Sequence, residues 1–412
     1  MPDWRCLRKC AGLLAVLMSF AMPAAELTDL YQATVPAAQS QAQWQRQALA
    51  AVLLKLTGSP DAQNQPGLAD ALKNSGQFVV QFQQVQSEGQ SQLLVTLDGQ
   101  KITRLLQSLQ IPVWGPRRPD VLLWLTERPV DTPQFVASPD HPLRKALLSQ
   151  AGLSGLSLQF PLLDETDTTL VNEAASWGGD WALLQQASMR YQATEVYNLL
   201  FDQITDASGL VQFRLTWQQL VDGAVQSHEI IHADAMALAQ QFCTELARTQ
   251  AARYAVRIAA PGASTAQRLQ LTVDGVSSLT DLARLRQLFG AMLTVREQHL
   301  VQYSAGQAVL ALQLSASAEE FYRALSLVRE LTPQTEASTD STGTTTVPLL
   351  SDAEAAMDAA LADSAVSDTA VPQSPTVPES SVTPSPDEQA SAAAHSASTP
   401  LVYSTRYLFR RQ

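Results

Sequence analysis

Val121-Leu122-Leu123-Trp124-Leu125 is the stretch that decides the fold of this chain, because five consecutive apolar residues leave no polar face. A strand with one solvated face alternates apolar and polar residues, whereas a strand buried on both faces is apolar throughout. The run therefore predicts a strand that is covered on both sides.

Helices and further strands alternate around this run. Helices are expected from Asp140, with Pro142 in the first turn, over Trp181 to Tyr191 and over Ala235 to Tyr254, and strands over Leu156 to Leu163, Glu195 to Ile204, Leu210 to Leu220 and Val225 to His232. Asp222-Gly223 between the last two strands is a strong hairpin signal. Residues 118–257 are thus predicted to form a central three-layer α/β domain with an antiparallel edge.

Residues 26–115 are expected to form a separate N-terminal α+β domain. Ser40 is a suitable N-cap for a helix that ends at Gly58, where a left-handed residue is favoured. A short helix follows at Leu68 to Asn74, and a hairpin is predicted from the strands 78–82 and 93–97. Asp98 is expected to cap one more helix.

Residues 265–331 show the order β-α-β-β-α, one strand short of a ferredoxin-like fold. The expected elements are Leu269 to Val273, Ser278 to Phe289, Met292 to Tyr303, Ala308 to Leu314 and Ala318 to Leu331. Residues 401–412 contain a β-prone apolar segment. It is either the closing strand of a ferredoxin-like β-α-β-β-α(-β) module or a free terminal motif.

Residues 332–400 separate that segment from the module and are rich in Ser, Thr, Ala and Pro. Ten acidic residues and no Lys or Arg lie between 331 and 400, so this segment carries most of the net charge of −12. Its sparse apolar residues cannot offset the entropy of ordering, which predicts a disordered acidic tract. The rest of the chain is only mildly acidic and has no basic stripe, which argues against nucleic acid as a partner.

Residues 1–25 have the three-part layout of a signal peptide. Arg5, Arg8 and Lys9 precede an apolar run, and Pro23-Ala24-Ala25 supplies small residues before the expected cleavage site. The apolar run is too short for a stable transmembrane helix, so the mature chain is expected to have none. The expected location is the periplasm, without a lipid anchor, because neither Cys6 nor Cys10 would follow the cleavage site. Only Cys243 would then remain, which excludes an intramolecular disulfide.

Five motifs carry a resemblance to a known family. They are Tyr31-Gln32-Ala33-Thr34-Val35-Pro36, the run Ala48 to Gly58, Phe160-Pro161-Leu162-Leu163-Asp164-Glu165-Thr166-Asp167, Trp177-Gly178-Gly179-Asp180 and Ala187-Ser188-Met189-Arg190-Tyr191. In this order they resemble the proteobacterial exported proteins grouped as domain of unknown function 2066. The resemblance implies a Gram-negative envelope protein without an established activity, and it supplies no catalytic residues.

Few residues are candidates for a catalytic or metal-binding role. Asp164, Glu165 and Asp167 follow an expected strand, where α/β domains often place metal sites, but their spacing departs from the D-x-D phosphatase loop. A capping or solvated cluster is the favoured interpretation. His228 and His232 would form a metal pair only on a helix, and the pattern there is that of a strand.

Three further features have an ordinary structural interpretation. The sequence around Ser154 lacks the final glycine of a G-x-S-x-G nucleophile elbow. Cys243 is expected to be a small residue of the hydrophobic core. Trp177 and Trp181 bracket two glycines and could present aromatic rings to a glycan or peptide, but packing in the core is favoured. The sequence therefore assigns no catalytic, cofactor-binding or metal-binding residue and predicts no cofactor.

These observations favour a noncatalytic periplasmic protein that binds or scaffolds other proteins of the cell envelope. The alternative is a metal-dependent hydrolase that uses Asp164 and Asp167. The sequence leaves the partner and the oligomeric state open.

Overall fold

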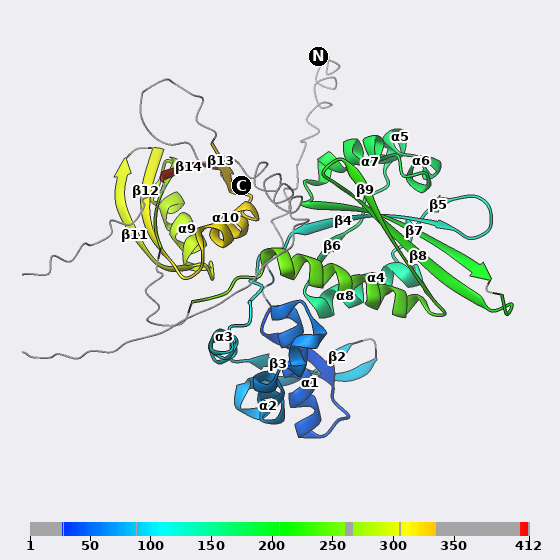
Figure 1. Ribbon diagram of the computed structural model, residues 1–412, viewed down its shortest axis with the longest axis horizontal. Coiled ribbons are helices and arrows are strands. Elements are labelled where there is room, and N and C mark those ends of the chain that lie inside the picture. Colours follow the sequence, from blue (N-terminus) through cyan, green and yellow to red (C-terminus); the bar gives the residue numbers. More distant parts are fainter. Residues whose placement is uncertain are drawn as a thin grey trace, which may run out of the picture. The chain divides into compact units, whose positions relative to one another are not determined.

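The computed structural model describes residues 27, 29–87, 89–205, 207–259, 267–304, 306–334 and 404–410, which belong to one compact unit of the chain. Within these residues, three sheets and ten α-helices give the expected mixture of α/β and α+β organisation (Figure 1). The expected signal peptide and most of the expected acidic tract lie outside the described residues.

The first sheet belongs to the N-terminal part and is antiparallel, in the order β1-β3-β2. Its strands are β1 (Gln32–Pro36), β2 (Val79–Ser87) and β3 (Gln90–Leu97); the helices are α1 (Gln41–Thr57), α2 (Pro66–Lys73) and α3 (Gly99–Ser108), with 3-10 turns at Pro60–Asn64 and Ser75–Phe78. β1 was not predicted from the sequence, and the remaining strands and helices have ends shifted from the predicted ones.

Helix α1 begins and ends as its residues predict. The Gln43 side-chain oxygen accepts a hydrogen bond from the Ser40 backbone N–H at 3.1 Å, and Gly58 takes the left-handed conformation with φ of 66°. A Cβ on Gly58 would lie 2.3 Å from the Ala251 Cβ, so glycine is also required by close approach. Beyond the helix, buried Arg118 donates to the Lys55 carbonyl at 2.8 Å and places a cation at the negative end of the helix dipole.

The central sheet has the strand order β5-β4-β7-β8-β9, and β6 pairs with the first three residues of β4. Its strands are β4 (Asp120–Arg128), β5 (Gln134–Phe135), β6 (Ser157–Gln159), β7 (Glu195–Thr205), β8 (Val211–Val221) and β9 (Ala224–His232); its helices are α4 (Pro142–Ser154), α5 (Glu165–Leu170), α6 (Glu173–Trp177), α7 (Trp181–Ser188) and α8 (Ala235–Tyr254), with a 3-10 turn at Met189–Tyr191. β4 is parallel to β6 and β7, whereas β7, β8 and β9 form an antiparallel meander.

Strand β4 is buried on both faces, as its sequence predicts. Val121, Leu123 and Leu125 pack in one core with α4 and α8, while Leu122 and Trp124 pack in a second core with α7. None of these five side chains is more than 2% exposed. The sheet therefore separates two helical layers, which confirms the three-layer architecture.

The largest departure from the predicted elements lies between residues 156 and 191. The expected strand over Leu156 to Leu163 is only three residues long, because Pro161 cannot donate to a ladder and Leu163 takes a left-handed φ of 54°. The short helices α5 and α6, which were not predicted, follow. The expected helix over Trp181 to Tyr191 ends at Ser188 and continues as a 3-10 turn.

The third sheet has the order β11-β12-β10-β14-β13. Its strands are β10 (Arg268–Val276), β11 (Val295–Ser304), β12 (Gly306–Leu314), β13 (Leu331–Pro333) and β14 (Ser404–Phe409); its helices are α9 (Leu279–Gly290) and α10 (Ala318–Ser326). The β-prone segment near the end of the printed sequence therefore lies in this sheet as β14. It is parallel to β10, whereas the closing strand of a ferredoxin-like fold is antiparallel to the first strand.

β13 explains this difference in strand order. The helix expected to reach Leu331 ends at Ser326, and the chain then forms β13, which includes the first two residues assigned to the acidic tract. β13 runs antiparallel to β14, so β14 is inserted between β10 and the strand that directly follows the second helix.

We expect β14 to stabilise the third sheet through its buried aromatic residues. Phe409 is 6% exposed and packs in the core of this sheet, so Phe409→Ala should lower stability by about 3–5 kcal/mol. Hydrogen exchange of the full chain should show faster exchange in β10 and β13. Arg410→Ala, which removes an exposed side chain, is the control, and equal exchange in both variants would contradict the prediction.

Candidate functional site

The sequence-predicted carboxylates lie in a closed cluster with Arg190 and Tyr191. Asp164 caps α5 by accepting from the Asp167 backbone N–H at 3.1 Å, and Arg190 donates to both oxygens of Asp164 at 2.7 and 2.9 Å. Arg190 also lies 3.2 Å from Oδ1 of Asp167, and the other oxygen of Asp167, Oδ2, accepts from the Leu163 backbone N–H and from the Tyr191 hydroxyl. Hydrogen bonding from Arg190 is the main cause that lowers the pKa of Asp164.

The structure confirms one part of the sequence interpretation of these carboxylates and contradicts another. Capping is correct for Asp164, but Asp167 is fully buried and therefore is not a solvated carboxylate. Glu165 is exposed in the first turn of α5. Two of the resemblance motifs, around residues 160–167 and 187–191, meet here and fasten the irregular loop after β6 to the end of α7.

The two histidines lie on β9, as the strand pattern predicts, and have different partners. His228 stacks on Trp217 with ring centroids 5.4 Å apart, while His232 Nδ1 accepts from the Asp234 backbone N–H. Within the residues that the structure describes, no group of three or more His, Cys, Asp or Glu side chains could hold a metal ion.

The remaining sequence candidates lie at separate places. Ser154 is the last residue of α4 and is buried, and Cys243 is buried in α8, where desolvation raises the pKa of its thiol to about 12. Trp181 is the first residue of α7 and is buried in the core, whereas Trp177 is half-buried with the Arg128 guanidinium 4.5 Å above its ring. The two tryptophans thus do not form an exposed aromatic pair.

A feature that the sequence analysis missed is the outer edge of β9. β9 is the last strand of the central sheet and pairs with β8 over nine consecutive residues without a register shift. The strand Ala224–His232 contains no Pro, Lys or Arg and one acidic residue, Glu229. Among the described residues no strand pairs with its other side, so the edge is long and regular.

The other outer strands of the three sheets are protected in ways that proteins commonly use. β11 and β2 carry bulges, β5 has two residues, β6 has three, β13 has three and ends in Pro333, and β1 has five and ends in Pro36. β9 alone among these described edges lacks all of these features. Its composition was visible in the sequence, but its edge position depends on strand order.

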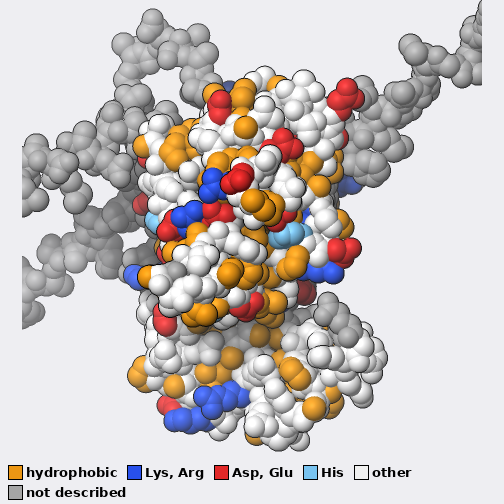
Figure 2. Space-filling model, turned by 90° about the vertical axis from the view of Figure 1, so that its right-hand side faces the viewer, with side chains coloured by type: hydrophobic (Ala, Val, Ile, Leu, Met, Phe, Trp, Pro, Cys, Tyr) orange, Lys and Arg blue, Asp and Glu red, His pale blue; other side chains and the backbone are white. Residues whose placement is uncertain are grey.

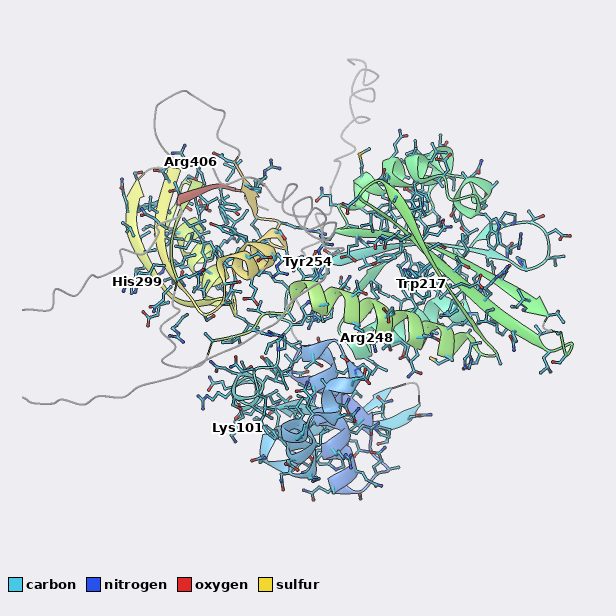
Figure 3. All side chains as sticks on the ribbon, in the orientation of Figure 1. Lys101, Trp217, Arg248, Tyr254, His299 and Arg406 are labelled. Atoms are coloured by element: carbon cyan, nitrogen blue, oxygen red, sulfur yellow. The ribbon has the colours of Figure 1, made fainter. Side chains whose placement is uncertain are left out.

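One face of β9 borders α8. The Trp217 and His228 rings stack there, Phe242 of α8 packs edge-on against Trp217 at 5.4 Å, and these residues line a groove of about 180 Å³. Trp217, labelled in Figure 3, lies between the sheet and α8. Trp217 is only 8% exposed and offers little ring surface to a ligand, whereas His228 is exposed on the strand edge.

The other face of the sheet carries a row of charges that ends at β9. Arg128 of β4 and Arg214 of β8 both bind Asp202 of β7, at 3.0 Å and 2.6 Å, and Arg214 also lies 3.8 Å from Glu229. We call these four residues the charge ladder. Burial alone would raise the pKa of Asp202, but hydrogen bonds from Arg214 and Arg128 outweigh it and lower this pKa. The ladder fixes the register of β4, β7, β8 and β9.

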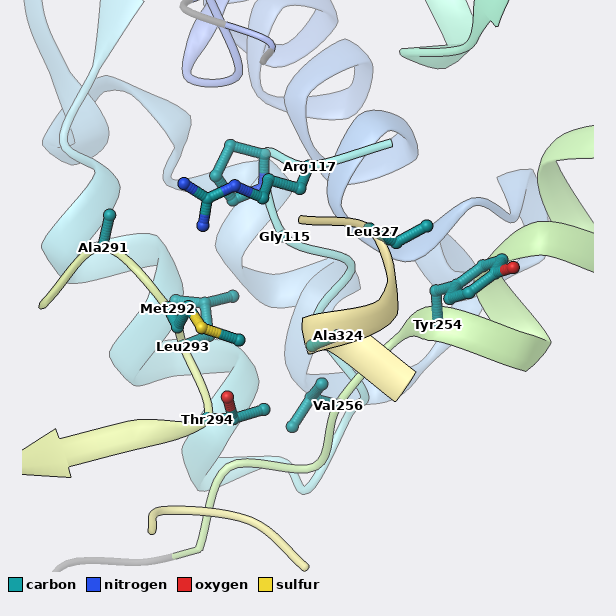
Figure 4. Close-up of a pocket in the computed structure, with 11 residues that line it drawn as sticks. Gly115, Arg117, Tyr254, Val256, Ala291, Met292, Leu293, Thr294, Ala324 and Leu327 are labelled. Atoms are coloured by element: carbon teal, nitrogen blue, oxygen red, sulfur yellow. The ribbon is translucent and has the colours of Figure 1, made fainter. Parts of the chain in front are cut away.

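A second, smaller cavity is partly open to solvent and is lined mainly by apolar side chains, together with Arg117 and Thr294. It has about 40 Å³ and is lined by Gly115, Tyr254, Met292 and Leu327 among others (Figure 4). Ligand pockets have volumes of about 300–1,000 Å³, so this cavity is a packing gap.

The visible surface adds no charged stripe. The face shown in Figure 2 mixes acidic and basic side chains among apolar ones. In the part of the chain that the structure describes, no helix is long and apolar enough to span a bilayer.

We predict that Asp167 contributes more to stability than Asp164. Asp167→Asn should cost about 1–3 kcal/mol, because it replaces one of the two buried oxygens that accept from Leu163, Tyr191 and Arg190 with an NH2 group that cannot accept. Asp164→Asn is the matched control and should cost less, since Asp164 is partly exposed. Urea unfolding followed by tryptophan fluorescence measures both, and a larger loss for Asp164→Asn would contradict this ranking.

We also predict an acid-dependent loss of stability from Asp202. Its pKa in the folded chain is lowered, so its ion pairs contribute fully above the unfolded pKa of about 3.9 and this contribution is lost as pH falls through the folded value. The difference in melting temperature between the original chain and Asp202→Asn should therefore shrink between about pH 5 and pH 3. A constant difference would show that the charge of Asp202 does not stabilise the fold.

The comparisons with known proteins concern mainly the N-terminal part. Residues 24–115 match the model of a family described as Domain of unknown function (DUF8605). No match was found to a curated protein or to a solved structure. An uncharacterised domain is therefore shown for this segment, but the match does not support domain of unknown function 2066, the family named from the motifs.

Proposed function

We propose that this protein is a noncatalytic component of the Gram-negative envelope that works in the periplasm by binding other envelope proteins. The periplasmic location rests on the signal-like pattern of residues 1–25. The motif resemblance to domain of unknown function 2066 beyond residue 115 also points to an exported protein, and remains part of this proposal.

The observation that carries the binding function is the open β9 edge. An exposed, regular strand can accept an extended polypeptide by main-chain hydrogen bonds, and side chains on both faces then provide specificity. Soluble proteins normally block such edges, because an unblocked edge pairs with other chains. An edge of nine residues without a bulge, Pro or Lys is therefore best explained by a partner that covers it.

The hydrolase alternative has weaker support. A catalytic divalent metal would need carboxylate oxygens that are free to coordinate it. Arg190 binds Asp164 through two hydrogen bonds and also contacts Asp167, whose oxygens are further used by Leu163 and Tyr191. These contacts weigh against a metal between the two residues.

The test is site-specific photo-crosslinking of the full-length chain in a Gram-negative host, combined with fractionation. A photoreactive residue at Ser227 of β9 should give adducts with envelope proteins in the periplasmic fraction. The same residue at Val301, which is 58% exposed on the bulged β11 edge, is the matched control and should give few adducts. Equal adduct formation at both positions would contradict binding through β9.

The effect of divalent metals on the melting temperature tests the hydrolase alternative. If the two carboxylates held a metal, Mg²⁺, Mn²⁺ or Zn²⁺ would raise the melting temperature and Asp164→Asn would abolish that rise. We expect no metal-dependent change in either protein. A rise that depends on Asp164 would overturn the proposal in favour of the hydrolase.

A further inference from the structure

We infer, building on the proposed binding through β9, that this edge pairs with the same edge of a second copy of the chain in an antiparallel register centred on His228. This pairing follows from the hydrogen-bonding pattern of β9, the position of its one acidic residue and the symmetry of its apolar residues.

The β8–β9 turn decides which backbone groups of β9 are free. Asp222 and Gly223 both have positive φ, at 51° and 80°, as in a two-residue type I′ turn, so Val221 and Ala224 form a hydrogen-bonded pair. Hydrogen-bonded and non-hydrogen-bonded pairs alternate along an antiparallel ladder. The even-numbered residues of β9 therefore bond to β8, and the backbone groups of the odd-numbered residues point away from β8.

A two-fold axis at His228 uses all of these free groups. Residue 227 then lies opposite residue 229 of the second copy, and residue 225 lies opposite residue 231. All four positions have outward N–H and C=O groups, so these pairs are hydrogen-bonded in both directions. His228 lies opposite His228 of the second copy as a non-hydrogen-bonded pair. This agrees with its backbone groups, which already bond to β8.

Two neighbouring registers, with the two-fold axis at Glu229 or at Ser227, would pair the outward backbone groups equally well but are less favourable. An axis at Glu229 would place this carboxylate directly opposite its own copy, and directly opposed like charges destabilise strand pairs. An axis at Ser227 would leave Ile231 opposite Gly223 in the turn. The axis at His228 instead places Glu229 opposite the uncharged Ser227.

The same axis matches the exposed apolar residues. Val225 is 49% exposed and Ile231 is 44% exposed, and both lie on the face of β9 that carries Glu229. Each lies opposite the other across the axis, so the contact buries two Val–Ile pairs. β-branched pairs of this kind stabilise antiparallel strands.

These features favour a second copy over an unrelated peptide. A contact with two-fold symmetry requires a surface that is complementary to itself. β9 meets this requirement in its backbone groups, its charge and its apolar residues.

Sedimentation of the full chain from Glu26 to Gln412 tests the pairing. We expect a dimer, and Ser227→Pro should raise its dissociation constant at least tenfold by removing an outward N–H. Pro is tolerated at an edge position whose N–H faces solvent, so the fold should persist, which circular dichroism checks. Ser227→Ala keeps the N–H and should remain dimeric. A monomeric original chain, or equal dimerisation of the Pro and Ala variants, would overturn the inference.

Single-cysteine crosslinking tests the register. In the proposed dimer the two residues at 228 have Cα atoms about 4.5 Å apart, within disulfide range, whereas those at 226 are about 14 Å apart. His228→Cys should therefore oxidise to a covalent dimer, and Gln226→Cys and Ile230→Cys on the same face should not. Cys243 is buried and is left in place. Rapid crosslinking at 226 or 230, or none at 228, would overturn the register.

The two proposals can fail separately. A monomer whose Ser227 photoprobe still captures other envelope proteins would overturn self-pairing and leave the proposed function standing. A crosslinked dimer that captures no other envelope protein would support self-pairing and contradict the proposed binding of other components.

Discussion

A buried hydrogen-bond network beside β4 is the interaction on which the central domain depends. An apolar strand that is buried on both faces does not specify its own register, because a slip by one residue replaces one apolar side chain with another. Thr126 of β4 contacts Ser176 at 2.8 Å, and Ser176 bonds to Asn198 of β7 at 3.0 Å; all three are fully buried. A slip would leave these polar groups unpaired, which is costly in a core.

The same face of the sheet extends this network outward. Trp124 donates to the Ser188 hydroxyl at 2.9 Å, which ties α7 to β4, and the charge ladder continues the polar row from β4 to β9. The apolar core with α4 and α8 supplies most of the buried area on the opposite face. One face thus contributes mainly hydrophobic stabilisation, and the other fixes which residues lie side by side.

Local signals in the sequence were sufficient for the long elements. The run 121–125, the cap at Ser40 and the Asp222-Gly223 turn each depend on neighbouring residues alone, and the corresponding β4, α1 and β8–β9 hairpin are present. Short elements were missed, because β1, α5 and α6 have five or six residues and carry too little periodicity. The parallel position of β14 depends on a distant strand, so sequence pattern could not supply it.

The candidate site was predictable only in part for the same reason. The sequence indicated that Asp164 could cap a helix, but the burial of Asp167 depends on Arg190 and Tyr191, more than twenty residues away. The composition of β9 was equally visible, and the hairpin turn predicted its pairing with β8. Its position at the end of the sheet follows from tertiary contacts of β4 and β7, so a pattern along the chain could not reveal the open edge.

The rigidity of β9 bears on how such an edge can bind. Ordering a flexible strand on binding costs entropy that reduces affinity. β9 is already held by nine regular pairs with β8, by the stacking of His228 on Trp217 and by the contact of Glu229 with Arg214. Its outward backbone groups are therefore aligned before a partner arrives. Two properties of this edge therefore favour pairing. It has no bulge or Pro that would block a second strand, and it loses little conformational entropy when that strand binds.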